Sequence, residues 1–433
     1  MRVLLIQPRV SAEPAYPLAL AGIIPLLEGA GHTVIGRDLC FDDEAEALAL
    51  AGDVDWIGAT VLHHNAPSVR RWMAPLTDSG RVRTFVAGAL PTLDPMGALA
   101  QTGAEFAVVG PPEDTVADLI DSAAPEHVAG VVHRTRATPK PRFHTPMALL
   151  PSPDRRVFPV EQYTHAMRST ALPYAQVITS RGCTLSCPYC PVPSMRPDGF
   201  DPRDPAQVAA EWDTLVTAHG VRSIHVEDDN FLAERGHAEA ICRALTDRGV
   251  SVAWELVNGI RPDQVDEVLL SRMAAAGCRR IVYSFEHLAA GQPPAIGTTL
   301  QHAERVVAWA KASGMRVGGY FMVGLPGESL SSNVLSIRYA LGLGLDDANW
   351  VPFYESPGSG FADCISTIDA TALDRRHAIR LAKAATIAFF ANPRTFGRLG
   401  SEMAATPATL PSLALKAVEL LRAGGPVPLR DTP

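Results

Sequence analysis

The chain has 433 residues, of which 38 are Lys or Arg and 46 are Asp or Glu, so its formal net charge is −8. This acidic balance excludes broad, sequence-blind binding to nucleic acid, which needs a basic surface. Hydrophobic residues make up 47% of the chain, enough for the cores of two or three domains, but no apolar run reaches the ~18–20 residues of a membrane span. With an N-terminus too short for a signal peptide, we expect a cytoplasmic protein.

Residues 1–125 alternate short apolar runs with amphipathic stretches. We predict strands at 3–7, 33–38, 55–62, 84–87 and 106–110, and helices at 17–29, 67–76 and 113–122. Regular alternation of strand and helix is typical of a doubly wound (Rossmann-like) domain, in which helices cover both faces of a parallel sheet. No G-x-G-x-x-G motif follows the first strand, so the dinucleotide-binding signature is absent.

A second region of regular alternation follows a proline-containing segment, 126–173, that we interpret as an irregular linker. We predict strands at 175–179, 223–227, 252–256, 280–285, 316–323 and 348–352, and helices at 205–218, 235–248, 263–276, 300–313 and 329–343. Repeated βα units of this kind predict a partial TIM-type (β/α)6 barrel over 174–365. Residues 366–433 are expected to form a short C-terminal helical region, with helices at 373–390 and 413–423.

Three cysteines, Cys183, Cys187 and Cys190, follow the first strand of this barrel with the spacing C-x3-C-x2-C. Three thiolates on one loop can bind three irons of a [4Fe–4S] cluster. No fourth cysteine stands at a matching spacing, so the fourth iron would be open to a bound molecule. The remaining four cysteines, Cys40, Cys242, Cys278 and Cys364, are scattered.

Three other interpretations of this loop stay open at this point. Cys187-Pro188-Tyr189-Cys190 alone is a dithiol redox motif, although Pro191 and Pro193 would disturb the helix that such a motif needs. A structural zinc site would need a fourth Cys or His in a second knuckle. The three thiols would otherwise be unrelated core residues.

The sequence resembles the radical S-adenosylmethionine (SAM) enzymes, which are defined by C-x3-C-x2-C. Four more segments resemble that family's strand motifs and occur in the same order: 226–231, 258–263, 284–286 and 318–328. The resemblance implies that Cys183, Cys187 and Cys190 hold a [4Fe–4S] cluster whose open iron binds SAM. Reductive cleavage of SAM in this family gives methionine and a 5′-deoxyadenosyl radical, which takes a hydrogen atom from an unactivated carbon.

The same resemblance implies a set of SAM-binding residues, namely Tyr189, Glu227, Asp228, Asp229, Ser284, Glu286, Val323 and Gly324. Tyr189 is expected near the adenine, and Glu286 at the SAM amino or ribose groups. Glu286 is alternatively a solvated charge at a strand end. Glu227, Asp228 and Asp229 are alternatively a Mg²⁺ site, and at least one of them is expected to cap the next helix.

The first domain resembles the cobalamin-binding domain of a large radical SAM subclass, through segments 16–21 and 27–32. The resemblance implies cobalamin contacts from Asn65, Gly88, Leu90, Thr92, Gly110 and Glu113. The usual cobalt-ligand motif D-x-H-x-x-G is missing, since the corresponding place reads Asp38-Leu39-Cys40. His63 and His64, just past the third strand, are either a cobalt ligand or a surface pair, and cobalamin binding stays open.

The leading hypothesis is therefore an enzyme, a cobalamin-dependent radical SAM methyltransferase acting on a small natural product. The alternative keeps the first domain as a scaffold and has the barrel catalyse dehydration, rearrangement or epimerisation of a sugar-like metabolite. A non-enzymatic electron-transfer module is the third hypothesis. We expect a flavodoxin-type or ferredoxin-type reductant as partner by family analogy. The substrate and any catalytic side chain are not predicted.

Overall fold

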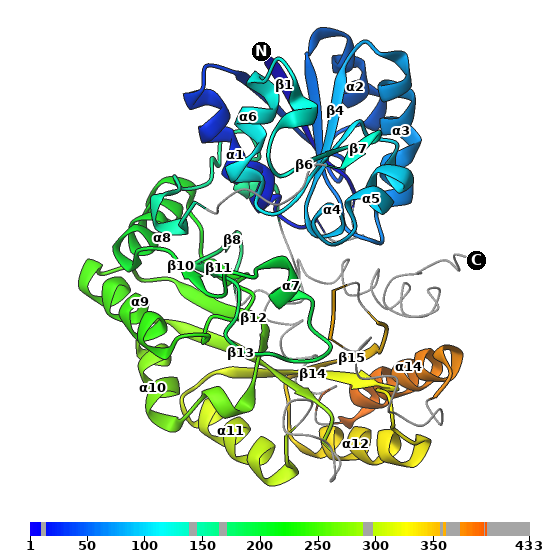
Figure 1. The fold of residues 1–433 in the computed structure, drawn as a ribbon. Helices are drawn as coiled ribbons and strands as arrows, with labels where there is room; N and C mark the ends of the chain where they lie inside the picture. The colour runs from blue at the N-terminus through cyan, green and yellow to red at the C-terminus, as the bar shows by residue number, and fades with distance from the viewer. Residues whose placement is uncertain are drawn as a thin grey trace. The chain divides into compact units, whose positions relative to one another are not determined.

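A computed structural model of the chain describes residues 1–9, 14–137, 145–163, 171–288, 298–355, 358–360, 373–393 and 395. The chain divides into two units (Figure 1). The first comprises Met1–Thr164 with Ser194–Pro197, and the second comprises His165–Pro193 with Asp198–Pro433.

The first unit contains a seven-stranded sheet in the order β2-β1-β3-β4-β5-β6-β7. Its parallel part consists of β1 (Arg2–Gln7), β2 (Thr33–Asp38), β3 (Trp56–Thr60), β4 (Arg83–Ala87) and β5 (Phe106–Val108). These strands overlap the five predicted from the sequence, because each contains a short run of apolar residues.

The sheet continues into the segment expected to be an irregular linker. Strand β6 (Val131–His133) pairs antiparallel with β5, and β7 (Arg136–Ala137) pairs antiparallel with β6. Val131 and Val132 are buried, so these residues belong to the core of the sheet. Strands of two or three residues are too short to produce a recognisable periodicity, which is why the sequence did not indicate them.

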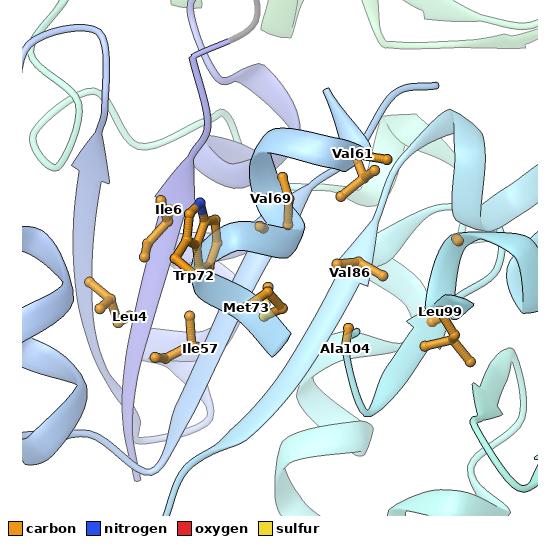
Figure 2. Packing of buried hydrophobic residues seen from close by; sticks show 14 of the residues in the cluster. Leu4, Ile6, Ile57, Val61, Val69, Trp72, Met73, Val86, Leu99 and Ala104 are labelled. Atoms are coloured by element: carbon orange, nitrogen blue, oxygen red, sulfur yellow. The ribbon is translucent and has the colours of Figure 1, made fainter. Parts of the chain in front are cut away.

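Helices cover this sheet as the alternation predicts. They are α1 (Leu18–Gly29), α2 (Glu44–Ala49), α3 (Ala66–Ser79), α4 (Ala89–Leu93), α5 (Pro95–Thr102) and α6 (Val116–Asp121). Figure 2 shows how Trp72 and Met73 of α3 lie against Ile6 of β1, Ile57 of β3 and Val86 of β4 in one hydrophobic cluster. The doubly wound architecture is therefore confirmed.

The second unit contains a six-stranded, entirely parallel sheet in the order β15-β14-β13-β12-β11-β8. The strands are β8 (Tyr174–Val177), β11 (Ser223–Val226), β12 (Ala253–Ile260), β13 (Cys278–Glu286), β14 (Arg316–Val323) and β15 (Asp347–Pro352). The helices between them are α8 (Pro205–His219), α9 (Arg235–Arg248), α10 (Glu267–Ala275), α11 (Leu300–Ala312) and α12 (Leu330–Gly342), and they lie in an arc along one side of the sheet (Figure 1). This is the predicted partial (β/α)6 barrel.

Alternate side chains of these strands face opposite sides of the sheet. Aromatic residues face the helices: Trp254 packs on Trp212 of α8 with ring centroids 5.9 Å apart, and Trp350 packs on Phe389 at 5.7 Å. Phe389 belongs to α14 (Arg375–Ala391), the described part of the C-terminal helical region. The helix predicted at 413–423 lies outside the described residues, and within the described residues no helix is long and apolar enough to cross a membrane.

Candidate active site

The cysteine loop leaves the sheet through a tight turn after β8. Strand β9 (Ser180–Arg181) pairs antiparallel with strand β10 (Asp201–Pro202), and this pairing closes the loop that carries the three cysteines. Gly182 has φ +77°, and a Cβ at this position would lie 1.8 Å from the Gly199 carbonyl oxygen. Only glycine fits this close approach of two backbone segments.

Two carboxylates from the loop after β11 hold the beginning of this turn. Asp228 is 2% exposed and accepts hydrogen bonds from the Thr179 backbone N–H at 2.6 Å and the Ser180 hydroxyl at 2.7 Å. Asp229 accepts one from the Gly182 N–H at 2.8 Å. The two acidic residues expected to contact SAM thus contact the protein backbone beside the cysteines. None of Glu227, Asp228 and Asp229 caps a helix as expected, because α9 begins only at Arg235 with Glu234 at its N-cap.

Cys183, Cys187 and Cys190 are all free and half-buried. Burial, together with the nearby Cys187 and Cys183 thiols, raises the pKa of Cys190 to about 11, so a metal must displace its proton on binding. In the described ranges, no three His, Cys, Asp or Glu side chains are grouped to hold a single metal ion. In a [4Fe–4S] cluster, each of the three thiolates would bind a different iron.

Side-chain nitrogen atoms approach two of these sulfur atoms. Asn230 Nδ2 lies 3.2 Å from Cys183 Sγ, and Arg261 Nη1 lies 3.9 Å from Cys187 Sγ. Donors of this kind favour a thiolate over a thiol. The donor set of this loop therefore fits an iron–sulfur cluster, which Cys183, Cys187 and Cys190 would hold. Asn230 and Arg261 lie within the motif segments 226–231 and 258–263, but the sequence alone indicated no role for either of them.

Tyr189 and Glu286, two of the residues predicted to contact SAM, lie together. The Tyr189 hydroxyl donates to Glu286 Oε1 at 3.2 Å, and Ser284 also hydrogen-bonds the Glu286 carboxylate. Glu286 is 6% exposed, so the alternative of a solvated strand-end charge is wrong. Burial raises the pKa of Glu286 to about 7 and, with the neighbouring Glu286, raises the pKa of Tyr189 above its usual range.

The backbone of Glu286 is also unusual. Its φ of 55° is the one positive value that the described part of the chain contains outside glycine. It stands where the register of β13 shifts against β14, between Ser284 and Glu286. Strain of this kind is concentrated at functional sites, where the surrounding structure holds it in place.

The remaining predicted SAM residues lie at the ends of neighbouring strands. Glu227 accepts a hydrogen bond from Gln176 Nε2 at 2.6 Å. Val323 is buried, and the Gly324 N–H donates to Asn333 Oδ1 at 3.0 Å. Gly324 has φ +80°, and a Cβ there would lie 3.1 Å from the Ala378 Cβ of α14. The described contacts therefore explain why a glycine stands at position 324: its backbone conformation and its close packing on α14 both disfavour a side chain.

Three of the predicted cobalamin residues, Gly88, Thr92 and Gly110, are linked by hydrogen bonds at the carboxyl ends of β4 and β5, and Leu90 lies between the first two in sequence. The Thr92 hydroxyl donates to the Gly88 carbonyl at 2.7 Å and accepts from the Gly110 N–H at 3.2 Å, and Leu90 N–H donates to the Val61 carbonyl at 3.3 Å. A Cβ on Gly110 would meet nothing within 4 Å, so the loop is open at this point. A crevice at strand ends is where doubly wound domains bind ligands, and this open loop fits a cofactor approached by backbone.

The other two predicted cobalamin residues, Asn65 and Glu113, contact other parts of the first unit. Asn65 Oδ1 accepts from the Leu62 N–H at 2.8 Å and closes the turn before α3. Glu113 lies against Gly22 of α1, where a Cβ would be 3.2 Å from its Oε1. Asp38, at the place of the missing cobalt-ligand motif, accepts a hydrogen bond from the Tyr163 hydroxyl at 2.7 Å. Burial lowers the pKa of His64, which keeps this imidazole neutral near pH 7.

Two known protein families match this chain. The Radical SAM superfamily matches residues 177–339, and the B12 binding domain matches residues 9–120. The two family models match in the order that the sequence resemblance implied, and the first includes all three cysteines. The protein is an enzyme with a radical SAM domain, whose cofactors are a [4Fe–4S] cluster and SAM.

More particularly, this radical SAM domain follows a B12 binding domain in the same chain. Cytidylyl-2-hydroxyethylphosphonate methyltransferase from Streptomyces wedmorensis is 28% identical over 194 residues, which are 42% of this chain and 35% of that protein. An uncharacterised methyltransferase from Pyrococcus horikoshii is 24% identical over 387 residues, which are 83% of this chain and 82% of that protein. The chain thus spans about a third of the first relative and most of the second.

A solved structure has the same fold over most of this chain. The radical SAM methyltransferase TsrM from Kitasatospora setae, with cobalamin and a [4Fe–4S] cluster bound, superimposes with a TM-score of 0.68 at 20% identity. The match covers 83% of this chain and 74% of TsrM. At this level of identity the likeness concerns the fold.

Proposed function

We propose that this protein transfers a methyl group to an unactivated carbon of a small natural-product substrate in a cobalamin-dependent reaction. The observation that carries the proposal is the order of its two domains, B12-binding and then radical SAM, in a chain with several relatives named as methyltransferases. When bound, the cofactors supply an electron, a carbon-centred radical and a transferable methyl group.

The residues of the second unit have the chemistry that this function requires. Cys183, Cys187 and Cys190 offer three thiolates, and Asp228 and Asp229 hold the loop by its backbone, so that cluster binding does not have to order it. Glu286 offers a buried carboxylate that can accept hydrogen bonds from the amino group of SAM, and Tyr189 orients it. A flavodoxin-type or ferredoxin-type protein would deliver the electron.

In the first unit, the linked residues Gly88, Thr92 and Gly110 would contact cobalamin. Thr92→Val keeps the shape of the side chain but removes both hydrogen bonds that connect these loops. Thr102→Val is the matched control, because the Thr102 hydroxyl donates within its own helix, to Ala98, and accepts from the Ala104 N–H at 3.3 Å, so it connects none of these loops.

The test uses the full-length protein, purified without oxygen and reconstituted with iron, sulfide and hydroxocobalamin. After gel filtration, we expect about one cobalamin per chain in the visible spectrum, reduced several-fold by Thr92→Val and unchanged by Thr102→Val. With SAM, reductant and a panel of candidate substrates, mass spectrometry should detect a methylated product. A wild-type protein that binds no cobalamin yet produces 5′-deoxyadenosine would overturn this proposal in favour of dehydration, rearrangement or epimerisation with the first unit as a scaffold.

A further inference from the structure

Two of the three cysteines receive a nitrogen donor from a side chain, and the donors come from two different strand ends. Asn230 follows β11 and lies 3.2 Å from Cys183 Sγ through its Nδ2. Arg261 follows β12 and lies 3.9 Å from Cys187 Sγ through its Nη1. Neither residue is needed as a cluster ligand, so their position beside the sulfur atoms calls for another explanation.

The orientation of the Asn230 amide is determined by its hydrogen bonds. Its Oδ1 accepts from the Leu232 N–H at 3.0 Å, which leaves the NH2 group to face Cys183. The same Nδ2 lies 3.2 Å from Gln264 Oε1, and Gln264 Nε2 donates to the Leu232 carbonyl at 3.0 Å. Asn230 is 4% exposed, so no solvent competes for its donor.

The Arg261 guanidinium group is held in a similar way. Its Nε donates to Asp263 Oδ1 at 3.0 Å and its Nη2 donates to Asp263 Oδ2 at 2.6 Å. This bidentate pair fixes the plane of the guanidinium group. The remaining nitrogen, Nη1, is the one that lies nearest Cys187 Sγ.

One short turn therefore positions both donors. Asp263 and Gln264 are consecutive residues of the 3₁₀ turn η6 (Pro262–Gln264), and each holds a donor that faces a different cysteine. We propose that Asn230 and Arg261 set the reduction potential of the cluster, and that Asp263 and Gln264 are the positioning residues for them. This inference rests on the cluster assignment within the proposed function, but not on cobalamin or on methyl transfer.

The physical reason is the charge that a cluster gains on one-electron reduction. Hydrogen bonds and positive charge beside the cysteine sulfur atoms stabilise the more negative, reduced state and raise the potential. Removing a donor should lower the equilibrium constant for reduction, and the external reductant must then be stronger. The effect falls on the potential, whereas a merely structural role would affect only folding or iron content.

The experiment is a redox titration of the reconstituted holoenzyme, without SAM or substrate, in which electron paramagnetic resonance follows the reduced cluster. Asn230→Leu and Arg261→Gln should each lower the reduction equilibrium constant about tenfold, which is about 59 mV for one electron. Asp263→Asn and Gln264→Leu should shift the potential in the same direction by less, and Arg261→Lys should recover part of the loss.

Arg235→Gln is the matched control, because Arg235 also pairs with an aspartate, Asp266, through Nη1 at 2.6 Å, but contacts none of the three motif cysteines. Its potential should equal that of the wild type. Wild-type potentials in Asn230→Leu and Arg261→Gln at full iron content would overturn the inference. If Asn230→Leu loses its iron, Arg261→Gln and Asp263→Asn decide the matter in the same way.

The failure of this inference can be told from the failure of the proposed function. Unshifted potentials in variants of an enzyme that methylates its substrate refute only the tuning role. Shifted potentials in an enzyme that transfers no methyl group refute only the methylation. A wild-type protein that reconstitutes no [4Fe–4S] cluster would refute both.

Discussion

Cys187 is the residue on which the candidate site depends most directly, because it is the middle cysteine of the motif and contacts both Tyr189 and Arg261. Cys187→Ala should lose one of three iron ligands and with it the cluster. We expect reconstituted iron and the formation of 5′-deoxyadenosine from SAM to fall at least tenfold. Cys40→Ala, a half-buried thiol of the first unit, is the control and should retain both. Full SAM cleavage by Cys187→Ala would show that this cysteine is not a ligand.

Glu328 shows how burial determines the charge of a single residue. It is 1% exposed, its Oε2 accepts from the Leu325 N–H at 3.0 Å, and its Oε1 lies 3.1 Å from His287 Nε2. Burial raises the pKa of Glu328 from 4.5 to about 7. A carboxyl group with a raised folded-state pKa binds more protons when folded, so its contribution to stability is complete below pH 4.5 and is lost as the pH rises towards 7.

The prediction from this shift is a pH dependence of unfolding. In the wild type, the free energy of unfolding should decline by about 1–3 kcal/mol between pH 4.5 and 7 because of Glu328. Glu328→Gln should remove this decline. Burial lowers the pKa of His287, whose effect below pH 6.5 has the opposite sign and remains in both proteins. Urea unfolding of the apoprotein at several pH values measures the difference, and equal slopes for variant and wild type would contradict the prediction.

At the scale of elements, four barrel strands are connected by one buried layer of charged side chains. His225 of β11, Glu255 of β12 and Arg280 of β13 are neighbours in register, and Arg280 Nη2 also pairs with Asp347 of β15 at 2.7 Å. Glu255 Oε2 lies 3.7 Å from Arg280 Nη1, and the Glu255 side chain has no exposed surface. The layer contributes contacts between strands that lie far apart in the sequence.

Arg280→Met should therefore destabilise the second unit, because it leaves the buried Glu255 carboxylate without its guanidinium partner. Breaking a buried pair in this way costs about 3–5 kcal/mol. The neighbouring Arg279→Met is the control, since Arg279 is exposed and donates only to backbone carbonyls, and should cost less than about 1 kcal/mol. Chemical denaturation measures the free energy of unfolding of both variants. Similar losses for the two would contradict the prediction that the buried charged layer stabilises the second unit.

At the scale of the whole molecule, the two units have separate cores. Trp72 packs within the hydrophobic cluster of the first unit, and Trp254 packs on Trp212 within the second. Proteins with several cores depart from two-state unfolding. We therefore expect two calorimetric transitions. Trp72→Ala should lower the temperature of only one of them and Trp254→Ala that of only the other, because each substitution reduces the free energy of unfolding of one unit by about 3–5 kcal/mol. A single transition that both variants lower would show that the units unfold together.

Much of this architecture was predictable from local patterns. The bounds of β2, α9 and β14 are those that the sequence predicted, because alternation and helical periodicity arise from near neighbours. The three cysteines and Tyr189 could be proposed as site residues for the same reason, since they share one short loop. Strands β6 and β7 were missed because so few residues carry no period. The third barrel strand was predicted to end at Leu256, whereas β12 continues to Ile260 and includes Asn258.

By itself, the sequence determined the two domains, the cofactor class and the cluster loop, because all three are recorded in spacing along the chain. Only the tertiary structure decided what the other polar residues do. Asp228 holds the backbone of Thr179, Asn230 faces Cys183, and Glu286 meets Tyr189. Each of these contacts joins residues that are roughly fifty to a hundred positions apart, and their geometry exists only after the strands assemble, since the parallel sheet brings all their carboxyl ends to one edge.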